Sequence, residues 1–165
     1  MRRDSGLDIG RLQRYLSQTV PDIGTIQSAE KFSDGQSNPT YRLHCGNQDY
    51  VLRSKPAGKL LKSAHAVERE FRVMDALAGS QVPVPAMFHL CEDVSVIGSV
   101  FFIMSHENGS IFWDPALPEL NTSERVSIYA DEIRVLAALH AIDPSRIGLS
   151  DFGRPGNYFE RQIKR

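Results

Sequence analysis

The strongest constraint on the fold comes from residues 25–54, where short alternating segments are separated by turn-forming clusters. Apolar and polar residues alternate, as in half-buried β-strands, over residues 25–32, 40–45 and 50–53. A Ser-Asp-Gly-Gln-Ser-Asn-Pro cluster at 33–39 separates the first two segments, and Gly46-Asn47 separates the last two. Such short connections join neighbouring antiparallel strands. The sequence therefore predicts a three-stranded antiparallel meander with a glycine-containing first connection.

Helical patterns flank this meander. Apolar stripes at helical spacing predict a helix over 8–19 that Asp8 caps, and another over 63–78 that Ser63 caps and Gly79 ends. Two further strands, over 87–91 and 96–104, form a predicted hairpin. We therefore predict an α+β fold with a five-stranded antiparallel sheet and one helix between its third and fourth strands.

A helical part follows a polar joint at 105–110. Asn121 and Glu124 form a capping-box pattern for a helix that runs to about residue 141. A last helix is predicted to begin near Asn157, which could cap it. We predict a first domain over 1–104, a linker over 105–110 and the start of a second, helical lobe over 111–165.

Charge, apolar runs and cysteines exclude several classes of protein. With 19 Lys+Arg against 20 Asp+Glu, the net charge of −1 excludes nucleic-acid binding through a strong positive field. The longest apolar stretch, at 100–104, is too short to cross a membrane, so no membrane partner is expected. Cys45 and Cys91 lack zinc-site spacing, and two thiols suit a reducing compartment. A cytoplasmic protein with two buried, unpaired cysteines and no metal site is predicted.

Residues that suit nucleotide chemistry occur in a definite order. Backbone N–H groups of the 33–40 loop could cradle phosphate oxygens, and Arg53 at the end of the third strand could reach them. Glu70 could hold the Arg53 guanidinium by an ion pair, although Glu68 competes for this place. Backbone groups where the last strand meets Ser105 could read an adenine edge. Each feature alone also fits an ordinary turn, a solvent-facing arginine or a solvated helix carboxylate.

Longer motifs carry a resemblance to a known family. They lie at 32–41, 50–61, 63–74, 82–85, 111–115 and 136–144. In these segments the chain resembles the aminoglycoside phosphotransferase and choline-kinase-like family, in particular the subgroup found as a domain of acyl-CoA dehydrogenase-associated proteins. The resemblance implies a protein-kinase-like N-lobe that binds ATP, followed by the first helices of an incomplete C-lobe.

The resemblance also implies roles for individual residues. The loop residues Asp34, Gly35, Gln36, Ser37 and Asn38 would cover the ATP phosphates. Three further positions would complete the nucleotide site. Arg53 would replace the usual phosphate-contacting lysine, Glu70 would be its helix partner, and Met104 to His106 would form the adenine-contacting hinge.

The catalytic carboxylates of the family are expected to lie outside this sequence. His140-Ala-Ile-Asp143 has the wrong spacing for a catalytic loop, and Asp151-Phe-Gly153 is expected to be a surface turn. No catalytic residue and no metal ligand is therefore assigned, and Mg is expected only together with the complete C-lobe. We expect the chain to stop before the catalytic loop and to lack phosphotransferase activity alone.

Three interpretations stay open at this point. The chain is the N-terminal part of a small-molecule kinase, a non-catalytic nucleotide-binding or regulatory module, or a structural remnant. The first predicts a hydroxylated small molecule as the acceptor in the complete protein. It also predicts exposed apolar surface on the last helices, with possible self-association.

Overall fold

An antiparallel sheet is the centre of the first structural unit. The computed structural model of the protein describes residues 6–33, 37–56, 58, 65–153 and 156–164. Within it, Met1–Asp75 and Val84–Trp113 form one unit, and Ala76–Pro83 and Asp114–Arg165 form a second. The sheet has five strands in the order β1-β2-β3-β5-β4, and all neighbours are antiparallel. The strands are β1 (Ser28–Lys31), β2 (Thr40–Cys45), β3 (Gln48–Ser54), β4 (Met87–Cys91) and β5 (Phe101–Ser105).

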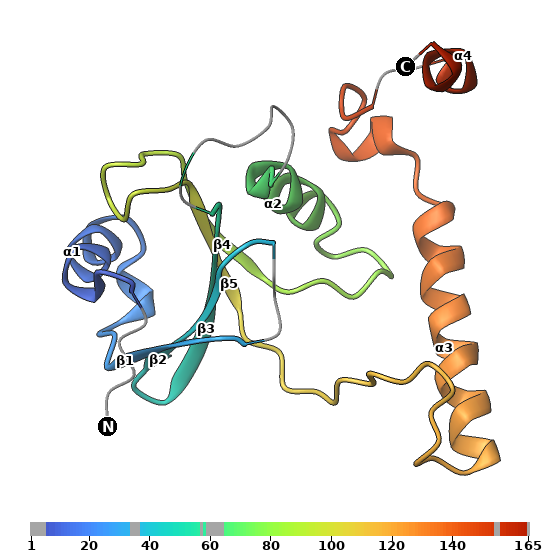
Figure 1. Cartoon of the computed structure of the whole chain (residues 1–165), viewed down its shortest axis with the longest axis horizontal. Helices are drawn as coiled ribbons and strands as arrows, with labels where there is room; N and C mark the ends of the chain where they lie inside the picture. The colour runs from blue at the N-terminus through green and yellow to red at the C-terminus, as the bar shows by residue number, and fades with distance from the viewer. Residues whose placement is uncertain (1–5, 34–36, 57, 59–64, 154–155, 165) are drawn as a thin grey trace. The chain divides into compact units, whose positions relative to one another are not determined.

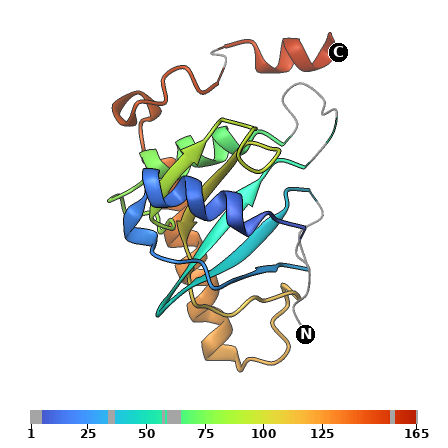
Figure 2. The ribbon, with the colours of Figure 1, turned by 90° about the vertical axis from the view of Figure 1, so that its left-hand side faces the viewer.

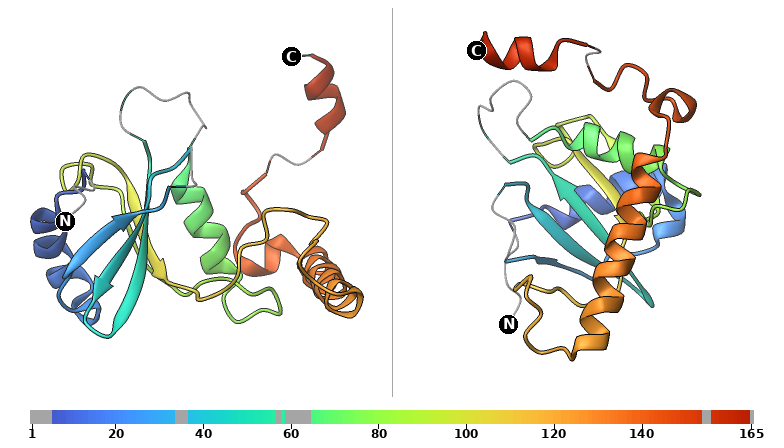
Figure 3. Two further views of the ribbon diagram at one scale, coloured as in Figure 1. Left: turned by 60° about the horizontal axis from the view of Figure 1, so that its bottom comes forward. Right: turned by 90° about the vertical axis from the view of Figure 1, so that its right-hand side faces the viewer.

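Helices cover both faces of this sheet. α1 (Ile9–Thr19) lies on one face and α2 (Val67–Ala76) on the other (Figure 1 and Figure 3, left). Figure 2 shows α1 lying across the strands. Asp8 caps α1 as predicted, because its carboxylate accepts a hydrogen bond from the backbone N–H of Arg11 at 2.9 Å. The predicted α+β class and five-stranded sheet are confirmed.

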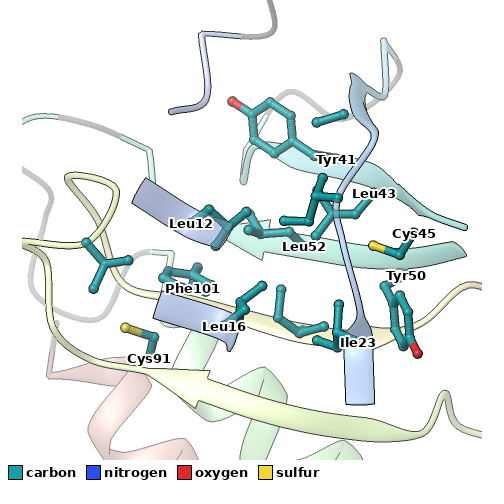
Figure 4. Close-up of a cluster of buried hydrophobic side chains, with 14 residues drawn as sticks. Leu12, Leu16, Ile23, Tyr41, Leu43, Cys45, Tyr50, Leu52, Cys91 and Phe101 are labelled. Carbon is teal, nitrogen blue, oxygen red and sulfur yellow. The ribbon is translucent and has the colours of Figure 1, made fainter. Parts of the chain in front are cut away.

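The main apolar core lies between α1 and the sheet. Figure 4 shows Leu12 and Leu16 of α1 among side chains of the central strands, including Leu52 and Phe101. These four side chains are no more than 1% exposed. Cys45 and Cys91 also belong to this core and are unpaired thiols, as expected. Burial raises the pKa of the Cys45 thiol to about 11, which keeps the group uncharged.

The opposite face of the sheet packs against α2 and carries the polar residues. The Phe71 and Phe102 rings are 6.0 Å apart in an edge-to-face arrangement. In the register, Arg53 lies opposite Thr40 on β2 and Phe102 on β5. Since side chains alternate along a strand, the fully buried Leu52 faces α1 and its neighbour Arg53 faces α2.

Several predicted element boundaries and caps differ from the structure. The strand predicted over 96–104 begins only at Phe101, because the residues around Val96 form a turn in which Val96 itself is buried. The strand predicted over 25–32 is limited to 28–31. The second helix begins at Val67, and Ser63, its predicted cap, lies outside the described residues. Asn157 precedes the last helix but makes no side-chain capping hydrogen bond.

The second unit is helical. α3 (Thr122–His140) begins with the predicted capping box, in which Asn121 and Glu124 bond to each other's backbone N–H groups. None of its residues is buried, and five apolar side chains are 41–65% exposed: Val126, Tyr129, Ile133, Leu136 and Leu139. A short 3-10 helix, Pro144–Ile147, and α4 (Tyr158–Ile163) follow. Among the described residues, none of the helices combines the length and the hydrophobicity needed to cross a bilayer.

Candidate nucleotide site

Arg53 is the cation at the centre of the candidate site, and its side chain is fixed from two elements. Its Nε donates to Oε2 of Glu70 at 2.5 Å, and its Nη2 donates to Oε1 of the same carboxylate at 3.3 Å. Its Nη1 donates to the Thr40 hydroxyl at 3.1 Å. Within the described part of the chain, one N–H on each terminal nitrogen is left without a protein partner. Guanidinium N–H groups that are left over in this way suit a phosphate group.

Glu70 also contacts the loop between β1 and β2. Its Oε1 accepts a hydrogen bond from Nδ2 of Asn38 at 2.9 Å. Asn38 is only 3% exposed, and its Oδ1 lies 2.9 Å from Nδ1 of His65, just before α2. One carboxylate therefore joins the sheet, the loop and the helix at a single point.

A second ion pair runs beside the first. Lys55 donates to Oε1 of Glu68 at 2.6 Å. This pair resolves the competition that the sequence left open, because Glu68 is occupied by Lys55 while Glu70 binds Arg53. Arg53 near the end of β3 and Lys55, directly after β3, are two positions apart, so their side chains lie on the same side of the strand. Each pairs with a carboxylate in the first turn of α2.

Among the other predicted site residues, those that the structure describes do not take part in these two ion pairs, and the rest lie outside the described residues. Asp34, Gly35 and Gln36 lie outside the described residues, whereas Ser37 is described and exposed directly before Asn38. Met104 lies on β5, opposite Val51 of β3 and Met87 of β4. His106 follows β5 and is partly exposed. The structure brings Arg53, Glu70 and Asn38 into contact and shows Met104 on the same side of the sheet as Arg53.

Two residues of this network were missed by sequence reasoning. Thr40 lies opposite Arg53 in the register of β2 and β3. A two-residue turn at Gly46-Asn47 implies this register, so the sequence could have identified Thr40. His65 lies 27 positions from Asn38. No local sequence pattern could have indicated that contact.

A separate charged cluster lies on the hairpin of β2 and β3. The Asp49 carboxylate accepts from Nε of Arg42 at 2.9 Å and lies 2.8 Å from Nδ1 of His44. Hydrogen bonds from Arg42, and more weakly from His44, lower the pKa of Asp49. Arg42 and His44 thereby favour the ionised form of the Asp49 carboxylate. The cluster lies on the α2-facing side of the sheet, as Val51 does.

The two segments that resemble catalytic motifs, 140–143 and 151–153, have a structural role or lie in a turn. The Asp143 carboxylate accepts from the backbone N–H of Ser145 at 2.9 Å and caps the 3-10 helix. Hydrogen bonds from the Ser145 side chain and backbone lower the pKa of Asp143. Residues 151–153 lie in a turn and bend, as expected. In the ranges that the structure describes, no group of three or more His, Cys, Asp or Glu side chains could hold a metal ion.

Comparison with known sequences identifies the class of protein. Residues 28–165 match the phosphotransferase enzyme family, so the chain belongs to this family. The sequence is 48% identical over 165 residues to acyl-CoA dehydrogenase family member 10 of Mus musculus, which covers 99% of this chain and 15% of that protein. The chain spans 15–21% of the length of the first curated relatives that it matches.

Solved structures confirm the fold. A candidate aminoglycoside phosphotransferase from Ralstonia eutropha JMP134 superposes with a TM-score of 0.82 and 48% identity, over 96% of this chain and 46% of that chain. A thermostable aminoglycoside phosphotransferase APH(4)-Ia variant, solved with ADP and hygromycin B, gives a TM-score of 0.54 at 18% identity, over 81% of this chain and 40% of that chain. The predicted family and kinase-like N-terminal fold are thereby confirmed.

Proposed function

We propose that this chain forms the nucleotide-binding part of an ATP-dependent phosphotransferase that transfers a phosphoryl group to a hydroxyl of a small molecule. The observation that carries the proposal is the Arg53 guanidinium, which Glu70 and Thr40 hold on the sheet face beside the loop between β1 and β2. A fixed cation with N–H groups left over for a ligand suits phosphate binding. Membership of the phosphotransferase family and the nucleotide complexes of two APH(4)-Ia variants support this assignment.

The proposed site divides into a phosphate end and a base end. At the phosphate end, backbone N–H groups of the 34–38 loop cover the phosphates, from residues Asp34, Gly35, Gln36, Ser37 and Asn38. Arg53 contacts a phosphate there, and Glu70 holds Arg53. Met104 and His106 border the adenine at the other end. Met104 lies opposite the buried Val51 on the side of the sheet that Arg53 faces. The partly exposed Met104 side chain offers apolar surface for a planar ring.

The residues present fit a nucleotide better than a metal ion. A bound ATP would supply the activated phosphoryl group, while Arg53 would neutralise and orient it. Magnesium is proposed to be held by carboxylates of a second lobe in the whole protein. The 1–104 segment is the proposed nucleotide lobe, 105–110 its hinge, and 111–165 the beginning of the second lobe.

Phosphoryl transfer by this chain alone is not expected. Of the two carboxylates that resembled catalytic ones, Asp143 caps a helix and Asp151 lies in a turn. This observation favours a second candidate function, in which the chain binds nucleotide without catalysing transfer. We propose a hydroxylated metabolite as the acceptor in the whole protein and a cytoplasmic location.

Calorimetric titration with ATP, with and without magnesium, tests the nucleotide site. Saturable ATP binding that Arg53→Ala weakens at least tenfold is expected, whereas equal affinity of both proteins would refute the assignment of Arg53. A coupled assay with ATP and hydroxylated small molecules separates the two candidate functions. Turnover by the isolated chain would show that it is itself a kinase.

The exposed apolar positions of α3 also suggest self-association. Five apolar side chains on one helix leave a large hydrophobic surface in contact with water. We expect a concentration-dependent increase in mass in analytical ultracentrifugation, which Ile133→Glu reduces. A strictly monomeric wild-type chain would rule this out.

A further inference from the structure

The buried Asn38 amide has only one orientation that satisfies its neighbours. One end of the amide lies 2.9 Å from Oε1 of Glu70, a carboxylate oxygen that also accepts from Arg53. Because an ionised carboxylate only accepts hydrogen bonds, this end must be the NH₂ group. The carbonyl end therefore faces His65.

That orientation determines the protonation of the His65 ring. The Asn38 carbonyl oxygen lies 2.9 Å from Nδ1 of His65, so Nδ1 must carry a proton. Which imidazole nitrogen is protonated follows from the hydrogen bond that the ring makes. The backbone of His65 has φ +58°, in the left-handed region that non-glycine residues seldom occupy. Such a conformation is maintained where surrounding contacts require it, and the contact with Asn38 is such a requirement.

A continuous chain of contacts thus links the start of α2 to the candidate phosphate cation. It runs from His65 through Asn38 to Glu70 and ends at Arg53. Asn38 is 3% exposed, and each end of its amide has a protein partner. Its side chain therefore acts on the guanidinium through Glu70.

We propose that Asn38 and His65 are positioning residues that hold Glu70, and through it Arg53, in the orientation that binds a phosphate. Asn38 follows β1 and lies shortly before β2, so its contact with the carboxylate ties this connection to the orientation of the cation. The inference rests on the proposed nucleotide function for its effect on ATP, while the linkage itself can be observed without ATP.

The linkage is tested by nitrogen NMR of the histidine rings in the whole chain at a pH where His65 is neutral. We expect Nδ1 of His65 to be protonated and Nε2 to be unprotonated. Asn38→Ala should shift the ring towards the Nε2-protonated form, and His140→Ala, which changes an exposed histidine of α3, should not. A wild-type ring protonated on Nε2 would overturn the linkage.

The positioning role is tested by a double-mutant cycle on ATP affinity. Asn38→Ala and His65→Ala should each weaken ATP binding, about tenfold for Asn38→Ala, since a hydrogen bond to a charged group is lost. In an Arg53→Ala background the same changes should add nothing, because they act through Arg53. Additive losses would show that Asn38 contacts the nucleotide directly and would refute the positioning role.

Two further variants separate the positioning role from a failure to fold and from a failure of the proposed ATP function. Asn38→Asp should weaken binding more than Asn38→Ala, because a second carboxylate would face Glu70. The partly exposed His65 offers a variant that should fold even if Asn38→Ala does not. If the wild-type chain binds no ATP, the proposed function fails, and the ring tautomer alone decides the linkage.

Discussion

The two parallel ion pairs between β3 and α2 allow a matched test of the site. Glu70→Gln removes the charge that pairs with Arg53, and Glu68→Gln removes the charge that pairs with Lys55. The pairs are alike in length, at 2.5 Å and 2.6 Å. They are also alike in exposure, with side chains 30% and 36% exposed in the first and 23% and 36% in the second.

The expected cost to folding is similar for the two variants. Both pairs are partly exposed, so solvent screens much of their attraction, and we expect each substitution to lower the free energy of unfolding by about 1 kcal/mol. Glu70→Gln costs slightly more, since a glutamine NH₂ group cannot accept the hydrogen bond from Nε of Arg53. Urea denaturation at constant pH measures both changes.

The expected effects on ATP binding are very different. Glu70→Gln releases Arg53 and should weaken ATP binding by about tenfold, which corresponds to ~1.4 kcal/mol. Glu68→Gln leaves the Arg53 contacts in place and should change the affinity by less than about twofold, within the range of a remote surface substitution. Equal losses of affinity in the two variants would refute the reasoning, because the effect would then follow stability rather than the orientation of Arg53.

Further predictions concern stability and reactivity. Leu16→Ala should destabilise the chain by about 3 kcal/mol in urea denaturation, because a fully buried side chain is removed from the α1 core; a change below about 1 kcal/mol would contradict this packing. Asn121→Ala removes the capping box and should cost α3 about 1 kcal/mol, seen as lower helicity by circular dichroism. Cys45, with a pKa raised to about 11, should react with iodoacetamide at pH 8 roughly 100-fold more slowly in the native chain than in urea. Burial raises the pKa of Tyr15 from 10.0 to about 12, so the folded state holds this proton more tightly. Its contribution to stability should be complete below pH 10 and lost as the pH rises towards 12, measured as a falling urea midpoint.

Elements with local determinants were predictable from the sequence. The cap of α1 and the capping box of α3 each depend on residues three positions apart, and both were predicted correctly. β2 was predicted with the bounds that it has, because its alternation is uninterrupted and turns enclose it.

The strand predicted to begin at Val96 was wrong for a physical reason. Val96 is only 9% exposed and belongs to the core, yet its N–H bonds to the carbonyl of Asp93 at 3.3 Å within a turn. An apolar residue indicates burial, but burial does not distinguish a strand from a turn that packs on the core. Local hydrogen bonds form this turn, including one from the Ser95 N–H to the Asp93 carboxylate at 2.8 Å.

The ion pair of the site was predictable from the sequence, but the contact of Asn38 with His65 was not. The order of Arg53 and Glu70 along a strand and a helix indicated an ion pair, and the structure contains it. The contact of Asn38 with His65 joins a loop to a distant position with a left-handed backbone, and it depends on the assembled fold. Sequence patterns specify which residues are charged, whereas the fold specifies which of them meet.

The tight turn between β2 and β3 has a consequence for how this chain can vary. Gly46 adopts φ +68°, and Cys45 and Gln48 pair across the turn. Since side chains alternate along a strand, one extra residue would exchange the two faces of β3 if the turn kept only two residues. Leu52 would then leave the α1 core, and the Arg53 guanidinium would be driven into it without a partner. Relatives that keep a working site should therefore accommodate an extra residue in a longer turn, or in a bulge, and not in the regular part of β3.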